Sequence, residues 1–178
     1  MLVFWAQGYE GATLTDLTAA MGITRTSMYA AFGNKEELFR AVLQRYQSGP
    51  AEYLTRALEE PTARAVAMAF LAGGVATTTR ADSPLGCLVV QGSLAAGEVA
   101  QPARDILLSC REEACARLED RFRRAVEAGD LSSDTDPALL ARYLMTVSNG
   151  LAVQAAGGVG RRELQTIADA ALRNWPPV

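Results

Sequence analysis

Apolar residues recur at spacings of three and four along most of the chain, and alternating apolar and polar positions are scarce. Spacings of three and four place apolar side chains on one face of an α-helix. Glycine and proline clusters at 8–11, 49–50 and 157–160 separate these segments and mark turns. The run at 87–90 looks strand-like, but four residues equally fit the buried start of a helix. The pattern predicts an all-α protein.

Capping residues delimit a group of short helices near the start of the chain. Thr13 is suited to cap the first of them, with Asp16 in the acidic position of a capping box. Thr24 and Asn34 are suited to cap the next two. A helix tail at 2–7 precedes the three capped helices at 14–21, 25–32 and 35–47. Further helices are expected near 50–59, 61–80, 90–100, 102–129, 137–156 and 161–174.

The first two capped helices have the arrangement of a helix-turn-helix, because a tight turn at Gly22 joins them. In that motif the N-terminal end of the second helix enters the major groove, where an arginine fork can bind guanine and hydroxyls can bind phosphates or base edges. Four apolar residues are spaced to meet across the turn: Leu17, Met21, Ile23 and Met28. The residues expected to contact DNA are Thr13, Thr15, Thr24, Arg25, Thr26, Ser27, Tyr29 and Lys35.

The segments GYEGATLTDL at 8–17 and MGITRTSMYAAFGNKEELF at 21–39 closely resemble the DNA-binding domain of the tetracycline-repressor (TetR/AcrR) family. The family's GY, T-x-x-D-L, G-[IV]-[ST], Y-x-x-F and K-E-x-L-F elements occur in order and at the family's spacing. The resemblance covers about the first 47 residues; the rest is similar only in general architecture. A structural three-helix bundle is the competing interpretation, and the ordered motif elements count against it.

The resemblance implies a homodimeric transcription factor, mostly repressing, that a small molecule releases from a palindromic operator. It implies an N-terminal helix-turn-helix domain over 1–47 and a larger helical domain for ligand binding and dimerisation over 48–178. Family members carry further residues before the position of Phe4, so we expect the usual start of the first helix to be missing here. Four basic and four acidic residues give 1–47 no net charge, which favours weak nonspecific DNA affinity. A sensor of the same fold that binds DNA weakly is therefore an alternative.

The composition excludes several kinds of site. The chain has no histidine, which removes Ser-His-Asp and Cys-His mechanisms and the commonest zinc ligand. Cys87, Cys110 and Cys115 form no CxxC pair, so neither a disulfide framework nor a cysteine zinc site is supported. Buried reduced thiols are the favoured interpretation of these cysteines, with a redox sensor as the alternative. We expect no metal and no cofactor.

The remaining function classes follow from charge and hydropathy. The net charge of −3 argues against a uniformly basic nucleic-acid-binding surface, so any DNA contact must be local. No apolar run reaches the roughly 18 residues of a membrane span, and the opening residues do not resemble a secretory signal. We expect a cytoplasmic protein without membrane contact. It is not expected to be an enzyme; a helical enzyme using carboxylate or cysteine chemistry is the less favoured alternative.

The sequence gives three further expectations, which concern the lever helix, the ligand site and the dimer interface. The helix at 35–47 begins beside the predicted DNA contacts and ends against the larger domain, so it is the expected lever between them. Polar groups among apolar helices predict ligand contacts at Phe70, Cys87, Gln91, Cys110, Tyr143 and Asn149. The last two helices, where the family places its dimer interface, carry apolar stripes at helical spacing that also fit an internal core. The expected interface residues are Leu140, Leu144, Val147, Leu151, Leu164, Ala168, Ala171 and Trp175.

Overall fold

The computed structural model of the chain describes residues 1–94, 101–173 and 175–176, and these residues form helices without strands. This confirms the all-α prediction. The four N-terminal helices are α1 (Leu2–Gly11), α2 (Leu14–Met21), α3 (Arg25–Phe32) and α4 (Lys35–Gln47). The others are α5 (Tyr53–Leu58), α6 (Ala63–Thr78), α7 (Leu88–Leu94), α8 (Gln101–Glu127), α9 (Pro137–Ala156) and α10 (Arg161–Ala171).

The predicted caps explain why the short N-terminal helices begin where they do. The Thr13 hydroxyl accepts a hydrogen bond from the Asp16 backbone N–H, and the Asp16 carboxylate accepts one from the Thr13 backbone N–H, each at 3.1 Å. Thr24 and Asn34 accept equivalent bonds from the third residue of their own helices. The Asp16 capping box is therefore complete. These local signals fixed the bounds of α2, α3 and α4 as predicted.

The structure refines three of the predicted segments. The first helix continues beyond residue 7 to Gly11, across a kink at Gly8, whose φ of 71° suits glycine. Of the two interpretations left open for 87–90, the structure confirms the helical one, with α7 beginning at Leu88. The helix expected over 90–100 begins at Leu88, and its second half falls on 95–100, outside the described residues.

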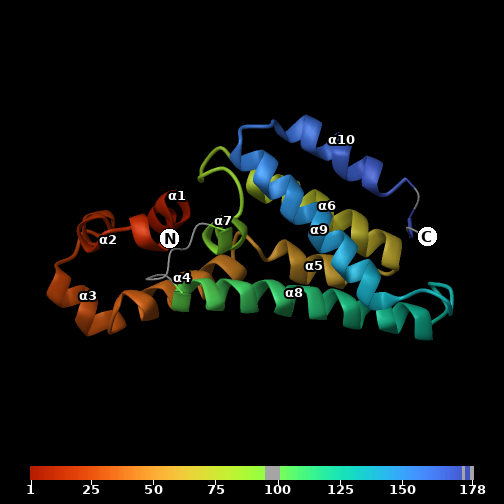
Figure 1. The fold of residues 1–178 in the computed structure, drawn as a ribbon, viewed down its shortest axis with the longest axis horizontal. Helices are drawn as coiled ribbons and strands as arrows, with labels where there is room; N and C mark the ends of the chain where they lie inside the picture. Colours follow the sequence, from red (N-terminus) through yellow and green to blue (C-terminus); the bar gives the residue numbers. More distant parts are fainter. Residues whose placement is uncertain (95–100, 174, 177–178) are drawn as a thin grey trace.

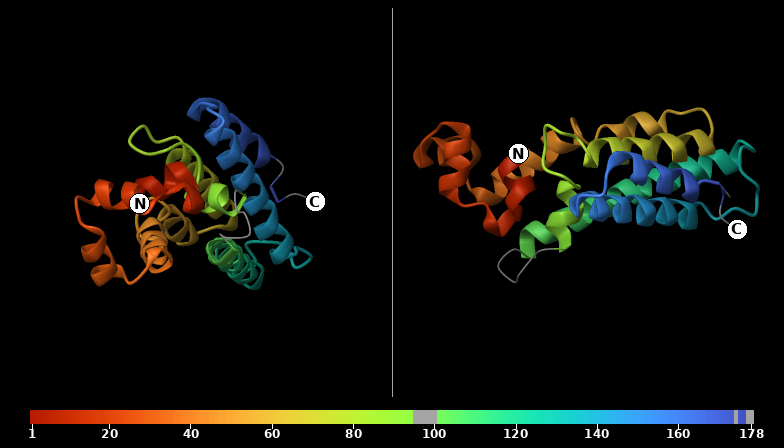
Figure 2. Two further views of the ribbon diagram at one scale, coloured as in Figure 1. Left: turned by 60° about the vertical axis from the view of Figure 1, so that its left-hand side comes forward. Right: turned by 90° about the horizontal axis from the view of Figure 1, so that it is seen from above.

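The helices form an elongated molecule with α1, α2 and α3 at one end (Figure 1). At the other end α6, α8, α9 and α10 lie side by side, as the view from above also shows (Figure 2). Helix α4 leads from the first group toward the second and contacts α8. The N-terminal group is called the head below, and the C-terminal group the bundle. Among the described residues, no helix has the length and apolar character needed to cross a bilayer.

Two hydrophobic cores underlie this arrangement. The head core contains Phe4, Met28 and Phe39 and also takes Leu88 from α7 and Leu107 from α8, all at most 4% exposed. The bundle core is formed by α5, α6, α8, α9 and α10. Side chains from beyond residue 47 thus complete the head core. The division into 1–47 and 48–178 stays a prediction.

The expected contact across the helix-turn-helix is corrected at one residue. Leu17 and Met28 are buried, and Ile23 is half-buried against the head core. Met21, however, is 37% exposed, at the last position of α2, where it lines a hollow with residues of α1 and α4. Packing between α2 and α3 therefore depends on Leu17 and Met28.

Five of the eight residues expected at the dimer interface are also corrected. These five lie in the bundle core of a single chain and are at most 4% exposed, because α9 and α10 pack on α6 and on each other. Three others are partly buried against the same core. The five buried residues are Leu140, Leu144, Leu151, Leu164 and Ala168, and the three partly buried ones are Val147, Ala171 and Trp175. The apolar stripes are internal, and the outer face of these helices carries Leu139, Val153 and Ile167 instead.

Candidate DNA interface and ligand cavity

The N-terminal end of α3 is presented at the far end of the head (Figure 1). Met28 is fully buried and anchors the helix, while Arg25 and Tyr29 are exposed, Tyr29 by 45%. A helix anchored on one face and open on the other can enter a major groove without rearranging its core. The exposed positions predicted to contact DNA are Thr24, Arg25, Thr26, Ser27 and Tyr29 here, together with Thr13 and Thr15 at the start of α2.

Hydrogen bonds order the hydroxyls and the arginine at this end. The Thr24 hydroxyl accepts from the Ser27 backbone N–H at 3.1 Å and lies 2.9 Å from the Ser27 hydroxyl. The Arg25 guanidinium donates from Nη2 to the Thr15 hydroxyl at 2.9 Å. Thr13 is engaged in its cap, where its hydroxyl donates to Asp16 at 2.6 Å. The structure thus brings predicted DNA contacts from α2 and α3 onto one exposed surface.

Lys35, at the start of α4, is less free than a solvated lysine. Its ammonium lies 4.7 Å from the centre of the Tyr9 ring, within range of a cation–π interaction. Partial burial lowers the pKa of Lys35, against the opposing attraction of Glu10. Arg40, also on α4, forms an ion pair with Glu36 at 2.8 Å. Arg25 is accordingly the better placed of the predicted cations for a direct DNA contact.

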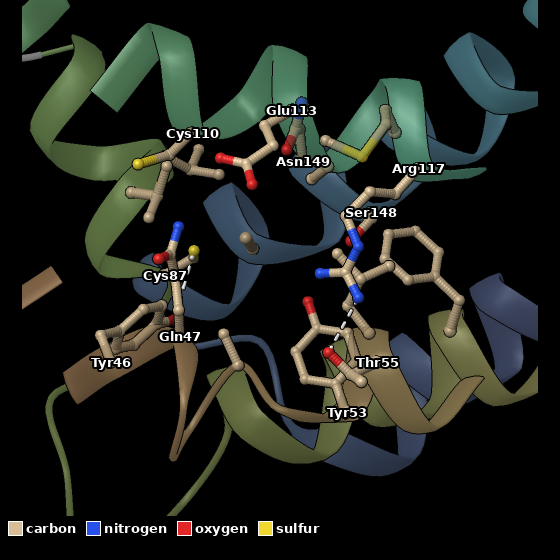
Figure 3. A pocket seen from close by; sticks show the side chains of 18 of the residues that line it. Tyr46, Gln47, Tyr53, Thr55, Cys87, Cys110, Glu113, Arg117, Ser148 and Asn149 are labelled. Atoms are coloured by element: carbon tan, nitrogen blue, oxygen red, sulfur yellow. Dashed lines mark hydrogen bonds between the residues drawn. The ribbon is translucent and has the colours of Figure 1, made fainter. Parts of the chain in front are cut away.

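A cavity of about 390 Å³ lies where the head meets the bundle, between α4, α5, α6, α7, α8 and α9 (Figure 3). Four of the six predicted ligand contacts line it: Phe70, Cys87, Cys110 and Asn149. Aliphatic and aromatic side chains form much of its wall, among them Leu54, Val89 and Met145. A concave, mostly apolar site with a few polar groups is typical of small-molecule binding.

The other two predicted ligand residues lie elsewhere, which corrects the prediction. The Tyr143 hydroxyl donates to the Ala171 carbonyl at 2.8 Å, because its ring is turned toward α10 and the Trp175 ring. Gln91 faces a separate hollow between α1 and α7, beside Gly86. Both side chains therefore lie outside the cavity wall, and Tyr143 instead joins α9 to the end of α10.

Several polar residues of the cavity were missed from the sequence. Glu113 and Arg117 share a face of α8 with Cys110, and the Arg117 guanidinium donates to the Thr55 hydroxyl at 3.0 Å (Figure 3). Positions three and four apart lie on one helical face, so this stripe was a usable signal. Tyr46 also lines the cavity at the end of α4. It was recognised only as the end of the expected lever.

Tyr53 is the missed residue with the clearest sequence signal. Its ring lies directly on the backbone of α6, where a Cβ on Gly73 would come within 2.7 Å of the ring. Glycine inside a helix costs about 1 kcal/mol relative to alanine, so a pair such as Gly73-Gly74 needs a reason. That reason is the close approach of Tyr53, which forms part of the cavity wall.

Burial favours the neutral form of two tyrosines and one thiol of the cavity wall. Burial, together with the nearby Cys87, raises the pKa of the Tyr46 and Tyr53 hydroxyls. Burial and the charge of Glu113 raise the pKa of the Cys110 thiol. The Tyr46 hydroxyl donates to Cys87 Sγ at 3.3 Å, and the Tyr46 ring meets the Trp5 ring edge-on at 5.0 Å. One aromatic side chain of α4 therefore contacts both the cavity and α1.

Comparisons with known proteins agree with this geometry. Residues 1–42 match the model described as bacterial regulatory proteins, tetR family, and residues 64–163 match the tetracyclin repressor-like C-terminal domain. The HTH-type transcriptional repressor ComR of Escherichia coli (strain K12) is 32% identical over 99% of this chain and 85% of its own length. The HTH-type transcriptional repressor DhaR of Mycobacterium sp. (strain GP1) is 27% identical over 83% of this chain and 74% of its own.

A solved structure is similar over nearly the whole chain. It contains a cysteine mutant of the TetR family transcriptional regulator CifR complexed with a 26-bp double-strand operator DNA. The TM-score is 0.93 with 42% identity, and the match covers 98% of this chain and 92% of the other. Head and bundle are thus arranged as in this regulator. By the two domain matches and this likeness, the chain belongs to the tetR family of bacterial regulatory proteins.

Proposed function

We propose that this protein is a ligand-responsive transcriptional repressor that binds a palindromic operator as a homodimer in the cytoplasm. The observation that carries this proposal is the exposed N-terminal end of α3, fixed by the buried Met28 and presenting Arg25 between ordered hydroxyls. Its family consists of regulators rather than enzymes, so the enzyme alternative is set aside.

The outer face of α9 and α10 is the surface we propose for dimerisation. Leu139, Val153 and Ile167 are 58%, 46% and 44% exposed there. Gly150 lies on the exposed side of α9 with open space where a Cβ would be, and small residues allow helices to approach closely. A symmetric pair would place two α3 helices about one DNA turn, roughly 34–36 Å, apart on a palindrome.

The cavity is the site we propose for the effector. Burial favours the neutral form of its tyrosines and of the Cys110 thiol, and Tyr46 and Arg117 bond to the lining residues Cys87 and Thr55. A small and largely apolar molecule with a few hydrogen-bonding groups suits such a wall. Helix α4 links this site to DNA, because Lys35 begins it in the head and Tyr46 ends it in the cavity.

Release from DNA then follows from linkage. The dimer can adopt one geometry whose two α3 helices match the spacing of the operator and one whose α3 helices do not. An effector that binds the mismatched geometry more tightly lowers the affinity for the operator. The size of this loss is set by the ratio of the effector's affinities for the two geometries. The test is to select duplexes from a random-sequence library with the purified protein. A repressor of this kind enriches a palindrome; recovery of no enriched duplex would favour the sensor without tight DNA binding.

A further inference from the structure

Two exposed side chains from different helices meet on the DNA-facing surface of the head. Arg25 is the first residue of α3, and Thr15 is the second residue of α2. The 2.9 Å hydrogen bond from Arg25 Nη2 to Thr15 Oγ1 joins them across ten residues of chain. A surface arginine without such a bond samples many rotamers, so this contact selects one orientation of the guanidinium.

The partner of Arg25 is a neutral hydroxyl, and this matters for DNA binding. The nearest carboxylate in sequence to Thr15, that of Asp16, is occupied by the Thr13 hydroxyl and the Thr13 backbone N–H. Among the described residues, Arg25 is in no ion pair. Its positive charge is therefore uncompensated, and the hydroxyl fixes its direction without reducing its attraction to DNA.

The geometry of the guanidinium leaves room for a base. Arginine carries five N–H donors in a planar fork, and Thr15 takes one of them. The remaining donors can form the bidentate pair with O6 and N7 of guanine that is the commonest specific contact in the major groove. Because the hydrogen bond to Thr15 already restrains the guanidinium, less side-chain entropy is lost when Arg25 binds DNA.

From this juxtaposition we infer that Thr15 is a positioning residue, whose hydroxyl holds Arg25 ready to read a guanine and does not itself bind DNA. The inference rests on the proposed function, since it requires α3 to read operator DNA. Helix α2 would thus contribute to base specificity indirectly, because Thr15 on α2 orients Arg25 on α3.

The test compares Thr15→Val, which removes the hydroxyl at nearly constant shape, with Thr15→Ser, which keeps it. The probe is the palindromic duplex enriched by the wild-type protein from a random-sequence library, together with its single-base variants, measured by fluorescence anisotropy. We expect Thr15→Val to weaken binding by about three- to tenfold, the size of one hydrogen bond. Thr15→Ser should stay within about twofold of the wild type. The base preference should flatten at the positions that Arg25→Ala flattens.

A double mutant separates positioning from direct contact. With Arg25→Ala already present, Thr15→Val should weaken binding no further. A uniform loss on all duplexes that persists in this background would mean that Thr15 itself binds the DNA backbone, and would overturn the inference. Unchanged or tighter binding by Thr15→Val alone would overturn it as well.

Thr79→Val is the matched control, because the Thr79 hydroxyl accepts from Arg161 Nε at the same 2.9 Å but lies in the bundle. It should leave affinity and base preference unchanged. Should the wild type enrich no duplex at all, the proposed function and this inference would both fail. If the wild type binds the duplex and Thr15→Val binds it equally well, only the inference about Thr15 fails.

Discussion

The indole N–H of Trp5 donates a 3.2 Å hydrogen bond to the carbonyl of Gly86, across 81 residues of chain. Gly86 is itself tightly held: its φ is 86°, and a Cβ there would lie 2.6 Å from the Gln91 side chain and 2.9 Å from Ala156. The next residue, Cys87, lines the cavity. The segment at Gly86 and Cys87 therefore contacts both α1, through Trp5, and α4, through Tyr46.

Trp5→Phe tests the hydrogen bond between Trp5 and Gly86. The substitution keeps an aromatic ring but leaves the buried Gly86 carbonyl without its donor, so we expect a loss of about 1–3 kcal/mol in the free energy of unfolding, measured in urea. Trp175→Phe is the control, because the buried Trp175 indole N–H has no hydrogen-bond partner among the described residues. Equal losses in the two variants would show that packing alone holds Trp5.

Arg25→Ala tests the predicted base contact. We expect it to cost about 1–3 kcal/mol of operator binding and to relax the preference at one base position in each half-site. Competition with single-base variants of the selected duplex measures both effects. A loss shared equally by all sequences would assign Arg25 to the DNA backbone.

The salt dependence of operator binding measures how many cations touch phosphate. If Arg25 and Lys35 alone neutralise phosphates in each half-site, the slope of log K against log salt should be about −4 for the dimer. A steeper slope would bring in further cations such as Arg45. A slope near zero would show that neither residue carries the contact.

Gly73→Ala and Gly74→Ala should differ although the residues are neighbours. A methyl at Gly73 would come within 2.7 Å of the Tyr53 ring, whereas one at Gly74 meets the Ser148 hydroxyl at 3.3 Å. We expect Gly73→Ala to lower the free energy of unfolding by about 1–3 kcal/mol and to push Tyr53 into the cavity. At Gly74 the gain in helix propensity, about 1 kcal/mol, should offset the tighter contact. Urea unfolding of both variants checks this.

The raised pKa of Cys110 predicts slow alkylation at neutral pH. Burial and Glu113 favour the protonated thiol in the folded protein, so the fold stabilises the neutral form relative to the unfolded chain. That stabilisation is present at low and neutral pH and is lost as the pH rises through the folded-state pKa, above the ordinary value of 9.0. Iodoacetamide kinetics in a Cys87→Ala/Cys115→Ala variant should show a midpoint above pH 9.0. A midpoint below it would contradict the assignment.

Val153→Asp tests the outer face of α9. A carboxylate at this 46% exposed position should leave the monomer folded and disrupt a dimer that covers it. Sedimentation velocity of this variant should show a monomer where the wild type shows a dimer. Met68→Asp, on an exposed residue of α6, is the matched control and should remain dimeric.

Sequence reasoning succeeded where the signal was local. Thr13, Thr24 and Asn34 each bond to backbone within their own first turn, so the start of each helix could be placed correctly. The stripe containing Leu140 and Leu144 was misassigned because helical spacing shows that a face is buried and does not show against what. The cavity draws on six helices, and its membership depends on their packing. Two sequence signals pointed to the cavity wall: the glycine pair at 73–74 and the polar stripe of Cys110, Glu113 and Arg117 on α8.

The head core includes Leu88 of α7 and Leu107 of α8, and both helices come after α5 and α6 in the chain. A fragment ending after α4 would therefore expose one wall of its own interior, and we expect it to remain unfolded. Because the head core needs side chains from α7 and α8, we expect the head to melt together with these helices in a single cooperative transition. A substitution that destabilises α7 or α8 should then also unfold the helix-turn-helix and abolish DNA binding.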